Sequence, residues 1–117
     1  MKLILSTHNL TLTKAIEDHI VSRIEKLEHL QPRVIDARVV VEHDTSKPTD
    51  KQFKCSIRLA VPGPDLYAED YREDLYAAMD FVTKKIEQQI RKLHNKRKAR
   101  KHTDAAALKR KRQDTTV

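Results

Sequence analysis

Hydrophobic and polar residues alternate in four short segments of this chain, at 2–8, 35–43, 53–61 and 66–71. A period of two is typical of a β-strand that has one face in the core and one in water. In the second segment, Ile35, Ala37, Val39 and Val41 are expected to share one face. The turn 62–65 contains Gly63, the only glycine of the chain, and predicts a tight reversal between the last two strands.

Two other segments repeat their apolar residues with the period of an α-helix. The first runs through Ile16, Ile20, Ile24, Leu27 and Leu30. Thr11 or Thr13 can cap this helix, and Pro32 is expected to end it. The second runs through Leu75, Met79, Val82, Ile86, Ile90 and Leu93. It predicts a helix over 74–96, which the basic residues that follow could extend by a turn.

The predicted order is therefore β-α-β-β-β-α. A strand, a helix and a second strand imply a right-handed crossover with the first two strands parallel, and short turns make the later strands antiparallel. Each helix has one apolar face, so both are expected to pack on one face of a four-stranded sheet as an α+β two-layer sandwich. We expect residues 1–100 to form one domain and 101–117 to form a basic, disordered tail.

Charge is concentrated at one end of the sequence. Residues 91–117 contain eleven Lys or Arg against two acids, a net charge of +9, whereas residues 1–90 contain 13 basic and 15 acidic residues, a net charge of −2. A basic segment of this kind suits a polyanion, because each Lys or Arg beside a phosphate releases condensed counterions. The distribution points to a nucleic acid as the partner.

Candidate contact residues lie on the outer surface of the second helix. One solvent-facing stripe of this helix is predicted to consist of Lys84, Gln88, Arg91, Asn95 and Lys98. One flank is predicted to consist of Lys85, Lys92 and Lys96. In the first helix His19, Arg23 and Lys26 share a flank that could border a groove between the helices. The alternative is that the stripe is only solvated and that Arg23 and Lys26 pair with glutamates one turn away.

The second helix also resembles a known family. The segment 74–80, Asp-Leu-Tyr-Ala-Ala-Met-Asp, and the segment 84–92, Lys-Lys-Ile-Glu-Gln-Gln-Ile-Arg-Lys, are similar to the bacterial ribosome hibernation promoting factors. This family includes ribosome-associated inhibitor A and the proteins once called sigma-factor modulation proteins. The first helix, from Ile16 to Glu28, resembles theirs as well, and the predicted element order agrees with their fold.

The resemblance implies a function and a set of contacts. It implies that the chain binds the small ribosomal subunit and its rRNA in the decoding channel, blocks mRNA and tRNA there, and inhibits translation in stationary phase or stress. The positions that match the family's contacts are Lys84, Lys85, Gln88, Arg91 and Lys92, together with Arg23 and Lys26. We expect the chain to lack the second domain with which long members pair ribosomes, and its basic residues 109–112 differ from the acidic tail typical of the inhibitor A branch.

Other chemistry finds little support. The six His residues lack zinc-site spacing, and Cys55 alternates with Phe53 and Ile57 as a small core residue would. No catalytic spacing is evident, so the chain is expected to be no enzyme and to use no cofactor, metal or small-molecule substrate. No apolar run is long enough to span a membrane, and a cytoplasmic protein that is monomeric off the ribosome is expected.

Two alternatives remain open at this stage. Tyr67, Tyr71 and Tyr76 could stack on unpaired bases, although at least one is expected to serve packing. A double-stranded RNA-binding protein without ribosome specificity is the other function considered, because such domains also back a sheet with two helices. Their second helix presents its N-terminus to phosphates, whereas here that end is acidic, at Glu73, Asp74 and Asp80.

Overall fold

The computed structural model describes the backbone of residues 2–112 and the side chains of residues 2–95. The chain forms the predicted sequence of elements, with one additional short 3-10 helix, η1, between β2 and β3. The elements are β1 (Lys2–His8), α1 (Lys14–Leu30), β2 (Asp36–His43), η1 (Thr49–Lys51), β3 (Phe53–Ala60), β4 (Leu66–Arg72) and α2 (Leu75–Arg112).

The four strands form one sheet in the order β1-β2-β3-β4. β1 and β2 are parallel, whereas β2 with β3 and β3 with β4 are antiparallel, which confirms the predicted directions. The register aligns Leu5 with Val39, Val39 with Ile57, and Ile57 with Ala68. The alternation read from the sequence therefore gives the sheet one apolar face.

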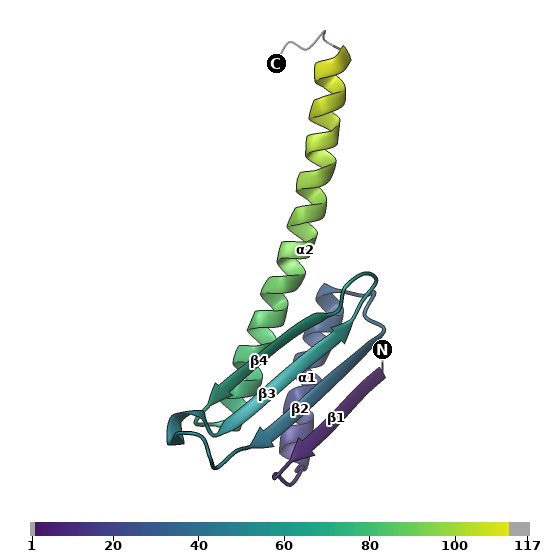
Figure 1. Cartoon of the computed structure of the whole chain (residues 1–117). Coiled ribbons are helices and arrows are strands. Elements are labelled where there is room, and N and C mark those ends of the chain that lie inside the picture. The colour runs from purple at the N-terminus through teal and green to yellow at the C-terminus, as the bar shows by residue number, and fades with distance from the viewer. Residues whose placement is uncertain (1, 113–117) are drawn as a thin grey trace.

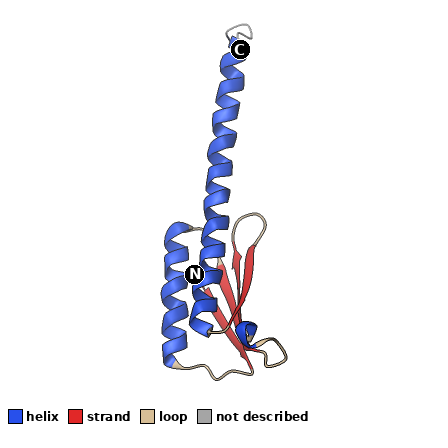
Figure 2. Ribbon diagram, turned by 90° about the vertical axis from the view of Figure 1, so that its left-hand side faces the viewer, coloured by secondary structure: helices blue, strands red, loops and turns tan. Residues whose placement is uncertain are grey.

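Both helices cover that apolar face, and the opposite face of the sheet is left without a helix (Figure 2). Ile20, Ile24 and Leu27 of α1 and Met79 and Ile86 of α2 are completely or almost completely buried in the shared core. The two-layer sandwich is thus confirmed. Since the buried apolar positions of both helices converge on one sheet face, the polar faces of α1 and α2 point outward side by side.

One residue departs from the predicted core pattern. Ile35 was expected to share the buried face of Ala37, Val39 and Val41, but it lies just before β2 and is 64% exposed. Its N–H donates a hydrogen bond of 2.7 Å to the carbonyl oxygen of Ala60. The alternation therefore does not extend to the residue before β2, where the neighbouring Val34 is buried and Ile35 is exposed.

Each helix begins at a side-chain cap. Thr13, one of the two predicted caps of α1, accepts a hydrogen bond at its Oγ1 from the Ile16 N–H at 3.2 Å. Asp74 performs the same task for α2, where its carboxylate accepts a hydrogen bond from the Ala77 N–H at 3.1 Å. Gly63 adopts a φ of 93° in the turn between β3 and β4, a conformation that favours glycine. These residues fix where the helices start and how β4 returns.

α2 is longer than the sequence predicted. Instead of ending within a turn of Lys96, it continues as one helix to Arg112 and projects well beyond the sheet (Figure 1). At about 1.5 Å per residue, its 38 residues span about 57 Å. The backbone of 101–112 is therefore helical, whereas residues 113–117 lie outside the described part, and the division into a domain and a tail at residue 100 stays a prediction.

The physical reason lies in the residues that follow Leu93. Between Leu75 and Arg112 the sequence contains neither glycine nor proline, and Ala, Lys, Arg and Leu are among the strongest helix formers. The predicted end near Lys96 follows the last apolar position of the periodic pattern, Leu93, and takes no account of this propensity. Whether 1–100 acts as a binding unit without the remainder of the chain stays a prediction.

Candidate nucleic-acid interface

The outward faces of α1 and α2 meet in a groove that ion pairs cross. The guanidinium Nε of Arg23 in α1 donates a hydrogen bond of 2.7 Å to Asp80 in α2, and the ring Nε2 of His19 lies 2.8 Å from the same carboxylate oxygen. Arg23 therefore pairs across the helix interface and not with a glutamate one turn away. The predicted flank of α1 does border a groove between the helices.

A second pair of contacts lies further along the same groove. Glu87 of α2 accepts a hydrogen bond of 2.6 Å from the Arg91 guanidinium, and its other oxygen lies 3.7 Å from the Lys26 ammonium. The Glu87 side chain is mostly buried, with 13% exposed, whereas those of Lys26 and Arg91 are 60% and 66% exposed. The carboxylate thus anchors two cations whose outer surfaces stay accessible to a ligand.

The groove contains two adjoining hollows of about 300 and 260 Å³. Their lining residues are Arg23, Lys26, Asp80, Thr83, Lys84, Glu87, Gln88 and Arg91. Four of these are basic and two are acidic, so the lining has a net charge of +2. Five residues that the sequence singled out, three from α2 and two from α1, are therefore brought together here.

The charge of Asp80 is stabilised by its neighbours. Partial burial alone would raise the pKa of this carboxyl, but the hydrogen bonds from Arg23 and His19 outweigh it and hold the pKa below its ordinary value. Asp80 therefore remains ionised at neutral pH and keeps the Arg23 guanidinium in a fixed position. A cation that is held in place loses less conformational freedom when an anion binds.

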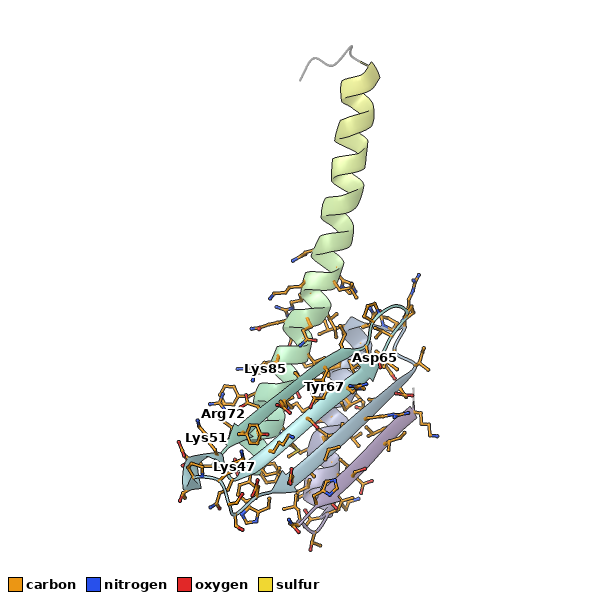
Figure 3. The ribbon with its side chains drawn as sticks, in the orientation of Figure 1. Lys47, Lys51, Asp65, Tyr67, Arg72 and Lys85 are labelled. Carbon is orange, nitrogen blue, oxygen red and sulfur yellow. The ribbon has the colours of Figure 1, made fainter. Side chains whose placement is uncertain are left out.

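Lys85 lies on a different side of α2 from the groove. Its ammonium donates a hydrogen bond of 2.9 Å to the Glu69 carbonyl oxygen and lies 3.4 Å from the Asp70 carboxylate, both in β4 (Figure 3). Asp70 has only 8% of its side chain exposed. The structure therefore does not bring Lys85 together with the groove residues, and instead uses it to tie α2 to the edge of the sheet.

The remaining predicted positions continue the exposed side of α2. Lys92 and Asn95 are exposed to solvent. Lys96 and Lys98 lie in the helical backbone of α2, whereas their side chains fall outside the described part. The groove residues, Lys92 and Asn95 are thus the predicted contacts with defined side-chain positions on the helix layer.

Sequence reasoning missed how the acids are used. Asp80 and Glu87 pair with α1, and this pairing depends on the angle and distance between the two helices, which one helix's period does not contain. The seven-residue spacing of the two acids, which puts both on one side of the helix, was the available signal. Phe81 was also missed: the guanidinium of Arg72 lies 3.8 Å from its ring centroid and the ammonium of Lys84 lies 5.7 Å from it.

The described residues offer neither a metal-binding cluster nor a membrane-spanning helix. No cluster of three or more His, Cys, Asp or Glu side chains within this part of the chain could hold a metal ion. Of the helices described, none combines the length and the apolar character that crossing a membrane requires.

The comparison with protein families decides the family. The model described as sigma 54 modulation protein / S30EA ribosomal protein matches residues 3–98, most of the chain. The chain belongs to this family. The match covers every strand, α1 and the part of α2 that lines the groove, so the groove is part of the family's own domain.

Curated relatives of this S30EA family member extend the finding. The ribosome hibernation promotion factor of Bacillus subtilis is 36% identical over 84 residues, which cover 72% of this chain and 43% of that protein. The factor of the same name from Picosynechococcus sp. is 32% identical over 99 residues, covering 82% and 50%. The one from Deinococcus radiodurans is 27% identical over 88 residues, covering 75% and 46%. The chain spans about half the length of these relatives.

Solved structures show the same S30EA fold. The N-terminal domain of Protein Y from Thermus thermophilus has a TM-score of 0.68 and 26% identity, and the match covers 80% of this chain and 99% of that one. A ribosomal subunit interface protein from Coxiella burnetii has a TM-score of 0.70, with 81% and 99% covered, at 14% identity. The second likeness concerns the fold alone.

Proposed function

We propose that this chain is a ribosome hibernation factor of the cytoplasm, a protein that binds the small ribosomal subunit without performing catalysis. The observation that carries the proposal is the convergence of Arg23, Lys26, Lys84 and Arg91 on one groove. Membership of a family whose relatives are named ribosome hibernation promotion factors supports the same conclusion.

The groove suits the phosphate backbone of folded RNA. Arginine and lysine contact phosphates through charge-assisted hydrogen bonds, which are about twice as strong as those between neutral groups. Here Asp80 and Glu87 hold Arg23 and Arg91 in place, while Lys84, Lys92 and Gln88 offer further donors along α2. Because phosphate contacts fix position without reading bases, we infer that the shape of the rRNA selects the site.

Inhibition of translation would follow from occupancy of the ribosomal site by the protein. On the resemblance noted above, the site is the decoding channel of the small subunit, where mRNA and tRNA lie during translation. A folded domain held there by its helix layer excludes both by volume. No chemical step is required, so the protein acts for as long as it remains bound and releases the subunit unchanged.

Sedimentation tests the proposal directly. The protein is centrifuged with purified small ribosomal subunits, or incubated with a naked RNA duplex, over a range of salt from about 50 to 200 mM. We expect sedimentation with the subunit, a steep loss of binding as salt rises, and competition by mRNA with initiator tRNA. Equal affinity for the duplex would favour a general double-stranded RNA-binding protein. Binding that does not change with salt would contradict the electrostatic argument.

A further inference from the structure

The sheet face that the helices leave uncovered has an ordered arrangement of its own. The register places Ile4, Arg38, Arg58 and Tyr67 in one row across the four strands. A row two residues further along contains Val40, Ser56 and Glu69, and a third contains Glu42, Lys54 and Tyr71. Tyr67 lies on this face, toward the viewer in Figure 3. The face is on the other side of the sheet from the helix groove.

Two arginines lie directly opposite one another in the first row. Arg38 of β2 and Arg58 of β3 are register partners, with 64% and 55% of their side chains exposed. Like charges in directly opposite positions destabilise a sheet. Their nearest carboxylates, Asp36 at 4.0 Å and Asp65 at 3.9 Å, are at the outer limit of an ion pair and compensate little. An anion between the two guanidinium groups would remove this repulsion.

Tyr67 gives the same row a flat aromatic surface. It is 45% exposed, and the Arg58 guanidinium lies 5.5 Å from its ring centroid. Its hydroxyl donates a hydrogen bond of 2.9 Å to Glu69, and the side-chain amide of Gln89 pairs with both its N–H and its carbonyl oxygen. The position of the ring is therefore fixed by the hydrogen bond of its hydroxyl and by those of the Tyr67 backbone. A hollow of about 310 Å³ joins it to Arg38, Val40, Ser56 and Arg58.

The third row repeats the combination of ring and cation. Tyr71 lies four residues after Tyr67 on the same strand face, about 13 Å further along. The ammonium groups of Lys47 and Lys54 lie 5.4 and 5.5 Å from its ring centroid. Lys54 also lies 3.4 Å from Glu69, which is thereby partly neutralised. Two aromatic rings in line, each beside a cation, match the surfaces on which unpaired bases stack.

We propose that this uncovered sheet face binds an unpaired segment of RNA. A phosphate lies between Arg38 and Arg58, and a base stacks on Tyr67. A duplex does not fit, because its base faces are hidden within the stack, whereas an unpaired strand exposes both a base face and a phosphate to one row of side chains. The inference does not require the ribosome as the source of the RNA, and it adds a second RNA surface to the one proposed for the helix layer.

The test uses the full chain and a fluorescein-labelled oligouridylate of about eight nucleotides, a length within the range of single-strand sites. Binding is measured by anisotropy at about 50 mM salt, where phosphate contacts are strong. Tyr67→Ala and the double variant Arg38→Gln, Arg58→Gln are each expected to weaken binding at least about fivefold. The matched control Tyr67→Phe keeps the ring and is expected to change affinity less than about twofold.

Photocrosslinking locates the contact independently of affinity. A 4-thiouridine oligomer is irradiated with the protein, and the modified peptide is identified by mass spectrometry. We expect a crosslink in β4 at Tyr67, and competition by unlabelled oligouridylate but not by polyglutamate. Crosslinks confined to α2, or equal competition by polyglutamate, would overturn the inference.

The two proposals fail separately. If the protein sediments with small subunits but crosslinks only through its helices, the sheet surface is refuted and the hibernation function stands. If Tyr67 crosslinks to the oligomer while the protein ignores ribosomal subunits, the opposite conclusion holds. Circular dichroism of each variant confirms that the fold is intact, and the exposure of Tyr67, Arg38 and Arg58 favours that result.

Discussion

The guanidinium of Arg23 in α1 and the carboxylate of Asp80 in α2 form a 2.7 Å hydrogen bond across the groove between the two helices. This bond links two helices whose buried faces pack on the same sheet face but whose outer faces have opposite composition. α1 presents acids at Glu17, Asp18 and Glu25, and α2 presents bases. The relative position of α1 and α2 therefore determines which basic residues of α1 lie in the groove beside those of α2.

Replacing Asp80 by asparagine is expected to lower stability by about 0.5 to 1 kcal/mol near pH 7, because both partners are partly exposed. The folded-state pKa of Asp80 lies below its ordinary value of 3.8, so the ionised carboxylate contributes fully above that value. Its contribution is lost as the pH falls through the folded-state pKa. Urea unfolding of both proteins from about pH 7 to pH 2.5 should show the stability difference shrinking toward zero.

The other carboxylates cancel in that comparison, since both proteins contain them. A stability difference that stays constant down to the lowest pH would contradict the assignment of the ionised form to Asp80. A difference that grows in acid would mean that the folded-state pKa is raised and not lowered.

The combined change Lys84→Glu, Arg91→Glu and Lys92→Glu is expected to abolish inhibition of translation while leaving the fold intact. The three positions are exposed and face away from the buried Met79, Val82 and Ile86. An in vitro translation assay with circular dichroism tests this. The change lowers the net charge from +7 by six, to +1.

A matched control separates position from total charge. Lys14→Glu, Arg33→Glu and Lys51→Glu lower the net charge by the same amount at exposed positions outside the groove lining. We expect this control to inhibit nearly as well as the unmodified protein at about 150 mM salt, where distant charges are screened. A further variant has glutamine, and not glutamate, at positions 84, 91 and 92. It tests whether repulsion between the new glutamates and Glu87 contributes to the loss of inhibition. If the α2 variant folds and still inhibits fully, the helix layer is not the binding surface.

Deleting residues 103–117 is expected to weaken binding to the small subunit less than the α2 charge reversal does. The deleted segment contains four basic and two acidic residues, so the net charge falls by only two, to +5. None of the groove residues is removed. Sedimentation over a salt series measures both variants. A truncated protein that loses binding while the charge-reversed one retains it would make the end of α2 the main contact.

Cys55 is expected to be inert toward thiol reagents in the folded protein. Burial, reinforced by the nearby charge of Asp70, raises the pKa of its thiol to about 12. At about pH 8 only about one thiol in ten thousand is ionised, and the thiolate is the reactive form. Ellman's reagent should therefore react slowly in buffer and completely in guanidinium chloride. Rapid labelling of a protein that retains its native circular dichroism would contradict the packed position of Cys55.

The fold was largely predictable because its signals are local. Apolar residues repeat with a period of two in β2 and β3 and with a period of about 3.6 in α1. Each period arises because one side of the element faces the core. Ile35 shows the limit, since the pattern extends the alternation to a residue that precedes β2 and is exposed. The length of α2 was underestimated because the predicted end follows the last apolar position of the pattern, whereas residues such as Ala105–Ala107 have a high intrinsic preference for the helix.

The site was less predictable because it depends on two elements at once. Lys84, Gln88 and Arg91 could be assigned to one stripe from α2 alone. Their association with Arg23 and Lys26 required the relative placement of the helices, and Lys85 fell on the far side, where β4 binds it. The row that joins Arg38, Arg58 and Tyr67 depends on the register of three strands, which no single segment of sequence contains.

The projection of α2 beyond the sheet also has consequences for kinetics. Residues 91–112 contain eleven basic residues and one acid, whereas residues 1–90 have a net charge of −2. Because the basic end lies on a helix that points away from the body, the molecule has a large electric dipole along one axis (Figure 1). In the field of a polyanion such a dipole turns the helix end forward before contact. The protein then meets the polyanion in a preferred orientation. Added salt should lower the association rate constant much more than it changes the dissociation rate constant.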